Sequence, residues 1–410
     1  MIRAVSSRRA STIPSALALS LLVPLAACGD ESPKMCSATT TGTGVPVELG
    51  IFDHVGIGSD NGSGWENTNQ ALHEFDWGQG PFQKLTLAFD LASSCSPFES
   101  WVNDPPPEGQ NWPVHCDAFD RNLDVFVEES LEDPLQDGLQ DSLEGPPIVL
   151  DDPWKHPEGA GSPFNVIHAI TPFGGPEHIE VDLTDLANAA PGKHNLRVRL
   201  VSFSDADGTV TGSNAGWTVS AKIVATTGQA PRRVLAAVPL FAKNVVRGDT
   251  PPTVTWDVPQ GARSGKIEYR ASGHGGGALD ARCNGPADEF CDRRHLISID
   301  GVQVDNIDAY RTDCALLCTL SHYGPADKGF DYCAENPCGD VRSVRASRAN
   351  WCPGSMTPPY VWSALDVFAQ PGPHVFSAEV LNVGDGGNWM LSAIYYAYAE
   401  DIAAGTGGSQ

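Results

Sequence analysis

The most constraining feature of this sequence is a repeated alternation of apolar and polar residues in short runs. Side chains in a β-strand point alternately to the two faces of a sheet, so this period is typical of strands with one buried face. Gly, Pro, Asn and Asp separate the runs, and long amphipathic helices are scarcely visible. The pattern predicts an all-β protein of antiparallel sandwiches. The clearest runs cover residues 84–89, 123–127, 196–201, 217–224, 254–258, 266–270, 296–299, 374–381 and 389–398.

A polar stretch that contains proline divides the chain near its middle. Residues 226–233 read TTGQAPRR, a composition that suits a boundary between domains. We therefore expect two sandwiches, over residues 45–226 and 234–402. The Asp-Gly pairs at 207–208 and 385–386 predict tight turns between paired strands.

The N-terminal residues have the form of an export signal. Arginines precede an apolar run at 16–25 that is too short to span a bilayer, and the run leads into Leu-Ala-Ala-Cys. This box resembles the bacterial lipobox, which implies a signal peptide over 1–27, lipidation of Cys28 and a lipidated tether over 28–44. An ordinary secretory peptide is the alternative. We expect an exported lipoprotein, anchored in the outer membrane or at the surface of a Gram-negative bacterium.

The charge balance disfavours nucleic-acid partners. The chain has 26 Lys plus Arg against 51 Asp plus Glu, a formal net charge of -25. Binding to the phosphate backbone needs clustered basic residues, and no basic run occurs beyond the first residues. The acidic segment 128–157 and the Asp205–Gly208 stretch both raise the idea of a calcium loop, but a surface insertion and a hairpin turn are the preferred interpretations.

The remaining cysteines suggest disulfides. An exported protein meets an oxidising compartment, and the chain contains no CxxC pair with the spacing of a zinc site. Short-loop disulfides are therefore expected and no metal site is. Setting Cys28 aside leaves ten of the 11 cysteines: Cys36, Cys95, Cys116, Cys283, Cys291, Cys314, Cys318, Cys333, Cys338 and Cys352.

Familiar catalytic motifs are incomplete. His274 opens an HGGG sequence, which matches the oxyanion-hole motif of some esterases, but the chain has no G-x-S-x-G nucleophile motif. The 11 histidines include no HExxH and no His-x-His, so zinc proteolysis and a histidine-rich copper site lack their ligands.

Two carboxylates beside cysteines are the remaining candidates. Asp120 lies between Phe119 and Arg121 just before an expected strand, and Glu289 lies within the small loop that a disulfide between Cys283 and Cys291 would close. A carboxylate on a rigid loop suits a general base or a group that stabilises a transition state. On spacing alone, a surface acid near a disulfide is the preferred interpretation of each.

Three motifs together resemble the bacterial peptide-N-glycosidase F family. They are Cys-Asp-x-Phe-Asp-Arg at 116–121, Glu-Phe-Cys-x-x-x-His at 289–295 and Arg-Ala-Asn-Trp-Cys-Pro-Gly at 348–354. Weaker matches support them at 52–55, 179–185 and 237–239. The resemblance runs from about residue 47 to 399.

The resemblance implies two tandem antiparallel jelly-roll β-sandwich domains, packed side by side with the active site between them. It also implies an amidase that hydrolyses the bond between Asn and the innermost N-acetylglucosamine of N-linked glycoproteins, leaving Asp and a glycosylamine. No cofactor is expected. The expected partners are N-linked glycoproteins or glycopeptides and the membrane, and the expected oligomeric state is a monomer.

The resemblance also assigns roles to individual residues. Asp120 takes the place of the essential carboxylate and Glu289 that of a second acid acting through a water. Arg121 and Arg348 correspond to arginines that hold the glycan core and the reacting carbonyl region. Trp351 and His274 are assigned to substrate binding, and the implied disulfides are Cys95–Cys116, Cys283–Cys291 and Cys314–Cys352.

This sequence departs from the family pattern at three places. A third acidic position falls on Val201, a neighbouring glycan-stacking tryptophan becomes Phe203, and a second tryptophan expected beside His274 corresponds to Ser272. These changes leave open an alternative, a catalytically impaired surface lipoprotein that binds N-glycans. Copper-dependent ascorbate monooxygenases share the paired jelly-roll arrangement, but the histidine pattern argues against that class.

Overall fold

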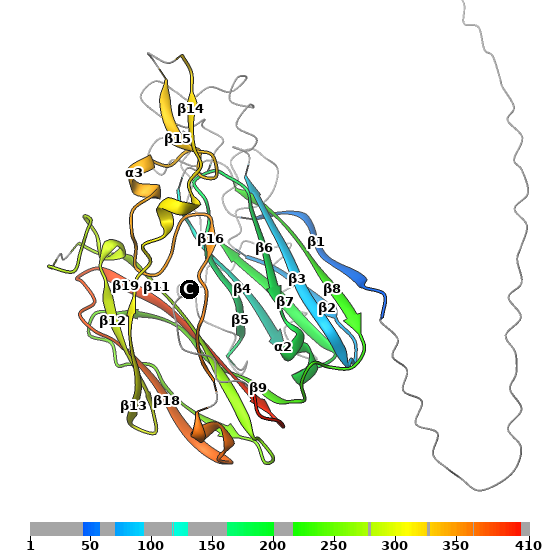
Figure 1. The fold of residues 1–410 in the computed structure, drawn as a ribbon. Helices are drawn as coiled ribbons and strands as arrows, with labels where there is room; N and C mark the ends of the chain where they lie inside the picture. Colours follow the sequence, from blue (N-terminus) through cyan, green and yellow to red (C-terminus); the bar gives the residue numbers. More distant parts are fainter. Residues whose placement is uncertain are drawn as a thin grey trace, which may run out of the picture. The chain divides into compact units, whose positions relative to one another are not determined.

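The structure is a computed structural model in which residues 43–410 form one compact unit (Figure 1). It describes residues 44–57, 70–93, 117, 119–129, 162–200, 216–277, 280–325, 329–363 and 365–402. Within these ranges, no helix is long and apolar enough to cross a membrane. Cys28, Cys36, Cys95, Cys116, Val201, Phe203, the turn expected at 207–208 and the core of the acidic segment at 130–157 lie outside the described residues.

The first half of the chain forms an antiparallel sandwich of two sheets. Their strand orders are β1-β8-β3-β6 and β16-β5-β4-β7-β2, which is the double Greek key of a jelly roll. A short helix, α2 (Thr184–Ala189), follows β6. The strands are β1 (Val47–Ile57), β2 (Gln70–Asp76), β3 (Phe82–Ser93), β4 (Asn122–Glu129), β5 (Phe164–Ile170), β6 (Glu177–Asp182), β7 (Lys193–Leu200), β8 (Trp217–Thr227) and β16 (Ser355–Met356), which comes from the second half.

The second half repeats this topology. Its sheets have the orders β10-β18-β12-β13 and β17-β11-β19-β9, and a separate hairpin pairs β14 with β15. The strands are β9 (Val234–Val246), β10 (Thr253–Val258), β11 (Ser264–Gly275), β12 (Arg293–Ile299), β13 (Val302–Ala309), β14 (Leu320–Tyr323), β15 (Phe330–Cys333), β17 (Tyr360–Ser363), β18 (Gly372–Val380) and β19 (Gly387–Tyr398). The short helices are η2 (Asp288–Phe290), η3 (Cys314–Leu317), α3 (Val341–Val344) and η4 (Asp366–Ala369).

The all-β expectation is confirmed, and the period of two explains it. Along β12, buried and half-buried residues alternate at every step, so that Ile297 and Ile299 pack into the second core. Each sandwich encloses its own apolar core between its two sheets. Burial of alternate side chains therefore fixes which face of each strand points inward.

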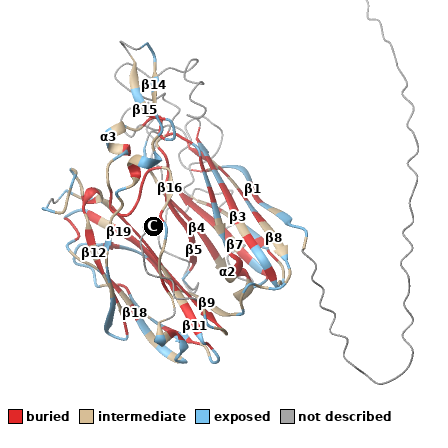
Figure 2. Ribbon diagram, viewed as in Figure 1, coloured by how far each residue is buried: buried red, intermediate tan, exposed pale blue. Residues whose placement is uncertain are grey.

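The two sandwiches share a tightly packed boundary. Strand β19 serves both cores, because Ile394, Tyr396 and Tyr398 pack into the first core while Tyr395 packs into the second. The Tyr398 hydroxyl also donates to a carboxylate oxygen of Asp185 over 2.7 Å. Figure 2 shows buried residues along strands β4, β5, β11 and β19. Both faces of the sheets at this boundary are covered by protein.

The turn expected at Asp385-Gly386 does not join paired strands. It connects β18 to β19, which lie in different sheets of the second sandwich. Gly386 has a φ of 73°, a conformation that favours glycine, so the local turn chemistry is correct. The prediction that the two flanking strands pair with each other was wrong, because β18 pairs with β10 and β12 while β19 pairs with β9 and β11.

Candidate functional site

Asp120 lies at the entry to β4, where two backbone contacts fix the chain. The Arg121 amide donates to the Thr171 hydroxyl over 2.9 Å, and the Thr171 amide donates to the Arg121 carbonyl over 2.9 Å. Burial raises the pKa of the Asp120 carboxyl to about 6 against the opposing charge of Arg348, and the Glu289 carboxylate adds to the rise. Asp120 can therefore exchange a proton close to neutral pH.

Asp117 holds the loop that carries Asp120 and Arg121 in place. Its carboxylate is fully buried and accepts hydrogen bonds from Arg121 Nε, at 3.0 and 3.2 Å, and from Arg121 Nη2 at 2.9 Å. The Trp217 indole donates to the other side of the same carboxylate over 3.0 Å. Asp117 thus fixes the guanidinium of Arg121 by a bidentate ion pair. Arg121 Nη1 has no hydrogen-bond partner among the residues described.

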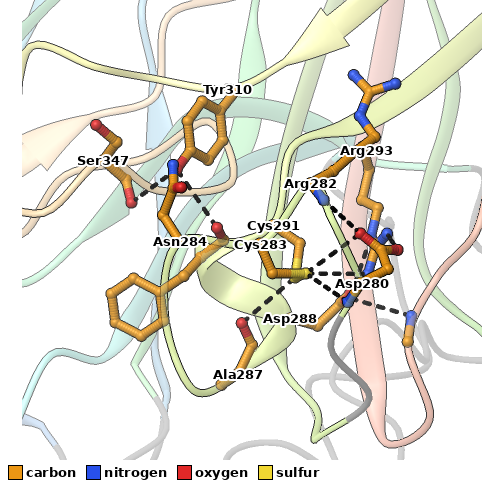
Figure 3. Close-up of a disulfide and its surroundings, with 12 residues drawn as sticks. Asp280, Arg282, Cys283, Asn284, Ala287, Asp288, Cys291, Arg293, Tyr310 and Ser347 are labelled. Atoms are coloured by element: carbon orange, nitrogen blue, oxygen red, sulfur yellow. Dashed lines mark hydrogen bonds and ion pairs between the residues drawn. A yellow bond between two sulfur atoms is a disulfide. The ribbon is translucent and has the colours of Figure 1, made fainter.

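Glu289 lies on the 3₁₀ turn η2, inside a loop closed by the Cys283–Cys291 disulfide. Figure 3 shows Asp288 and Arg293 beside this bridge. Asp288 is fully buried, and it accepts hydrogen bonds from Arg293 and, over 3.1 Å, from the Gly384 amide. The neighbouring carboxylate thus anchors the turn, while the Glu289 side chain remains 27% exposed.

Arg348 joins Glu289 to the interior. Its side chain is 1% exposed, and Nη1 donates to the Glu289 carboxylate over 3.0 Å. Nη2 donates to the Ser343 hydroxyl over 2.8 Å and to the Ser343 carbonyl over 3.0 Å. The guanidinium also lies over the rings of Phe290 and Trp351, at 4.5 and 4.3 Å from their centroids. Arg348 is therefore an interior cation that fixes the position of Glu289.

Trp351 contacts both the Arg348 guanidinium and the His274 ring. The two rings are stacked with centroids 5.4 Å apart, and the indole donates to the Gly273 carbonyl over 2.7 Å. Because Trp351 is 1% exposed, it supports Arg348 and His274 from behind and offers no open face. Burial lowers the pKa of His274 to about 3, and the positive charge of Arg348, with that of His168 whenever His168 is protonated, acts in the same direction. The His274 imidazole is therefore neutral near pH 7.

The residues converge from both sandwiches. Asp120 and Arg121 come from the first, and Glu289 and Arg348 from the second. The charges of Arg348, Glu289 and Arg121 all act on the Asp120 carboxyl, which places the four groups in one electrostatic neighbourhood. A proton acceptor, a second carboxylate and two guanidinium groups are the components needed to activate a water and stabilise an oxyanion.

Comparison with known protein families gives a match within the second sandwich. Residues 244–395 match the family model described as peptide-N-glycosidase F, C terminal. A search of curated proteins gives no significant match.

Solved structures of peptide-N-glycosidases share the whole fold. A peptide-N(4)-(N-acetyl-β-D-glucosaminyl) asparagine amidase is 14% identical, with a TM-score of 0.57, and the match covers 88% of this chain and 98% of that chain. PNGase F from Flavobacterium meningosepticum, described as a glycosylasparaginase, is 16% identical with the same TM-score and coverage. PNGF-II is 16% identical with a TM-score of 0.58, covering 86% and 65%. At these identities the likeness establishes the fold.

The structure also contains disulfides that bear on the assignments from sequence. Cys283–Cys291 and Cys314–Cys352 are both present, and a further bridge, Cys318–Cys333, staples the β14–β15 hairpin. The pair Cys95–Cys116 lies outside the described residues. The Cys314–Cys352 bridge links η3 to the segment that carries Arg348, because Cys352 lies four residues after that arginine.

Sequence reasoning missed two supporting residues. Asp117 was part of a recognised motif but had no role, although it holds Arg121 in place. Ser343 gave no signal, because its contact with Arg348 depends on the turn of α3. The spacing of an acid four residues before an arginine is the sequence pattern that could have identified Asp117.

Proposed function

We propose that this protein hydrolyses the amide bond between Asn and the innermost N-acetylglucosamine of N-linked glycans. The observation that carries the proposal is the convergence of Asp120 and Arg121 from the first sandwich with the Glu289–Arg348 pair of the second. Burial there raises the pKa of Asp120 to about 6, although the charge of Arg348 opposes the rise. A carboxyl with that pKa is ionised at pH 7 to 8 and is basic enough to accept a proton from water. The match of residues 244–395 to the peptide-N-glycosidase F model and the shared fold support the same reaction class.

In this mechanism Asp120 removes a proton from a water that attacks the side-chain carbonyl carbon of the substrate Asn. Asp120 gives that proton to the departing nitrogen as the C–N bond breaks, so the glycan leaves as a glycosylamine and the peptide keeps an Asp. Arg121 is the better oxyanion donor of the two arginines, because Asp117 fixes it and Nη1 stays unpaired among the described residues. Preorganised donors of this kind contribute strongly to catalysis.

Arg348 and Glu289 act mainly through position and charge. The guanidinium is occupied by Glu289 and Ser343, so it moderates the pKa of Asp120 and sets where the Glu289 carboxylate points. Glu289 is partly exposed and can hold a water or a sugar hydroxyl at the free side of its carboxylate.

The test is conversion of Asn to Asp at a glycosylation sequon. Purified protein is incubated with a denatured high-mannose glycoprotein in ¹⁸O-water, and the peptides are analysed by mass spectrometry. We expect release of glycan with one ¹⁸O in the new Asp, and loss of conversion with Asp120→Asn. Asp53→Asn is the matched control, since the Asp53 side chain is 94% exposed.

The same assay separates hydrolysis from binding. The alternative, a lipoprotein that binds N-glycans with impaired turnover, is favoured by Val201 at a position where the resemblance implies an acid. Retention of the glycoprotein without any labelled Asp would support the binding function. Absence of both retention and conversion would overturn both proposals.

We further propose export and anchoring through Cys28. The apolar run and the Leu-Ala-Ala-Cys box support lipidation of that thiol, with outer-membrane or surface placement in a Gram-negative host. Metabolic labelling with a fatty acid should mark the protein, and Cys28→Ser should abolish the label and release the protein from the membrane fraction. Label that persists in the variant would contradict the proposal.

A further inference from the structure

Four side chains form a continuous hydrogen-bonded chain from the first sandwich to the candidate site. His168 Nδ1 lies 2.7 Å from Asp124 Oδ1, and His168 Nε2 lies 2.5 Å from Ser272 Oγ. Ser272 Oγ lies 2.7 Å from His274 Nε2. Asp124 and His168 are direct partners on β4 and β5, and Ser272 and His274 alternate on β11, so the chain crosses the boundary between the sandwiches.

The first three members have the order of the Asp-His-Ser triad of serine hydrolases, but they cannot act as one. Ser272 is fully buried, Asp124 is 1% exposed and His168 is 2% exposed. The Ser272 oxygen is also occupied on its second side by His274. A nucleophile must reach the reacting carbon, and this oxygen is closed off from any substrate. These hydrogen-bonded side chains therefore have a role other than nucleophilic catalysis.

The donors and acceptors of the chain can be assigned in sequence. Asp124 Oδ1 accepts from the Asn165 amide over 3.0 Å, and as a carboxylate it also accepts the Nδ1 proton of His168. Where His168 carries only that proton, its Nε2 presents a lone pair, which takes the single hydroxyl proton of Ser272. A second proton on Nε2 would reverse the direction of these bonds. With one proton on His168, Ser272 can only accept from His274, so the proton of His274 lies on Nε2.

This arrangement leaves a lone pair on Nδ1 of His274. That nitrogen has no partner among the described residues, and it is not among the buried unsatisfied atoms of the structure. The ring lies on Trp351, whose other contact is the Arg348 guanidinium. Next to a cation, an acceptor is electrostatically favoured over an N–H donor.

We propose that Asp124, His168 and Ser272 are positioning residues that fix His274 as its Nε2–H tautomer, so that Nδ1 offers a hydrogen-bond acceptor at the candidate site. The ligand group it fits is an N–H or O–H donor, such as the acetamido N–H or a hydroxyl of a core N-acetylhexosamine. The choice of that ligand rests on the proposed function. The tautomer itself does not, because it is set within the protein.

The tautomer is measurable in the unliganded full-length protein. Histidine labelled with ¹⁵N in the ring gives two-bond proton–nitrogen correlations that distinguish the Nε2–H and Nδ1–H forms. We expect His274 to be a single Nε2–H tautomer at pH 8. An Nδ1–H tautomer, or an even mixture of the two, would overturn the proposal whatever the activity of the protein.

Ser272→Ala breaks the chain with the smallest possible change. We expect both tautomers of His274 to become populated and KM for glycopeptide to rise about 10-fold with kcat changed less, the equivalent of one neutral hydrogen bond. Ser264→Ala is the matched control, since Ser264 lies on the same strand, is 5% exposed and bonds to Glu400 instead. It should leave the His274 spectrum unchanged.

The two proposals fail in different ways. Wild-type protein that converts no sequon Asn overturns the proposed function, while the tautomer of His274 still decides the positioning chain. An unchanged His274 spectrum in folded Ser272→Ala overturns the positioning chain, while conversion by the wild type still stands. If Ser272→Ala does not fold, the wild-type tautomer remains the deciding measurement.

Discussion

At the scale of single residues, the environment of Asp120 couples chemistry to stability. Its pKa in the folded protein, about 6, lies above the ordinary value of 3.8, so the folded state binds this proton more tightly than the unfolded chain does. The ionised carboxylate therefore costs stability above pH 6, and the cost disappears as the pH falls toward 4. The proposed reaction needs the ionised Asp120 carboxylate, and that ionised form lowers the stability of the folded protein.

The first prediction concerns Asp120→Asn. We expect this variant to lose activity and to be more stable than wild type at pH 8, by on the order of 1–3 kcal/mol. The difference should shrink to near zero at pH 4, because wild-type Asp120 is then protonated. Urea unfolding at both pH values measures it, and wild-type activity should fall below pH 6. A variant less stable than wild type at pH 8 would contradict the assignment.

The second prediction concerns Arg348→Met. Removing the guanidinium takes away a charge that lowers the pKa of Asp120, so the acid limb of the pH–activity profile should move above pH 6. Loss of one member of a buried ion pair should also cost about 3 kcal/mol. Arg294→Met is the control, because Arg294 is 41% exposed and pairs with Asp308. Its acid limb should match that of the wild type.

At the scale of elements, short crosslinked loops hold the site while the strands provide the frame. Glu289 projects from a 3₁₀ turn that is fixed by the Cys283–Cys291 disulfide and by Asp288. The position of the first carboxylate, Asp120, depends on the start of β4 and on Asp117. Neither acid lies inside a strand, so both positions depend on how their loops are held.

The third prediction compares two disulfides. Replacing Cys283 and Cys291 by serine should cost about 2.5 kcal/mol of stability, and it should lower kcat/KM more than replacing Cys318 and Cys333 does. Both bridges close short loops, with sequence separations of 8 and 15, but only the first encloses Glu289. Equal effects on kcat/KM, measured at a temperature where both proteins are folded, would argue against a rigid Glu289.

At the scale of the whole molecule, the two sandwiches behave as one unit. Strand β19 contributes side chains to both cores, and β16 leaves the second half to pair with β5 in the first. Phe126 of the first sandwich packs against Ala242 and Met390 of the second. The site therefore lies on a boundary that cannot open without exposing apolar surface.

The fourth prediction tests this coupling with Ile394→Ala. Ile394 is 1% exposed and packs into the first core from a strand of the second sandwich. Its truncation should cost about 3 kcal/mol, and calorimetry should still show a single unfolding transition at a lower temperature. Val375→Ala, at a position 36% exposed, should change the transition little. Two resolved transitions in the variant would show that the sandwiches unfold independently.

One strand that is buried on both faces, β5, could not be predicted from the sequence, although the equally buried strands β4 and β19 were predicted. The runs at 254–258 and 296–299 show the period of two because only one face of each is buried. Every residue of β5 is buried, since its second face meets the other sandwich, so no alternation marks it. The role of its polar residue His168 is visible only in the tertiary structure, where His168 contacts Ser272 of the other sandwich.

The sequence by itself determined the all-β class, because that class depends on local periodicity, and its short motifs singled out Asp120 and Glu289 as candidates. Tertiary structure alone decided that Glu289 pairs with Arg348, that Asp117 holds Arg121 and that His168 reaches Ser272. The physical reason is that an antiparallel sandwich pairs strands distant in the chain. Contacts made across such sheets leave no periodic trace in either strand.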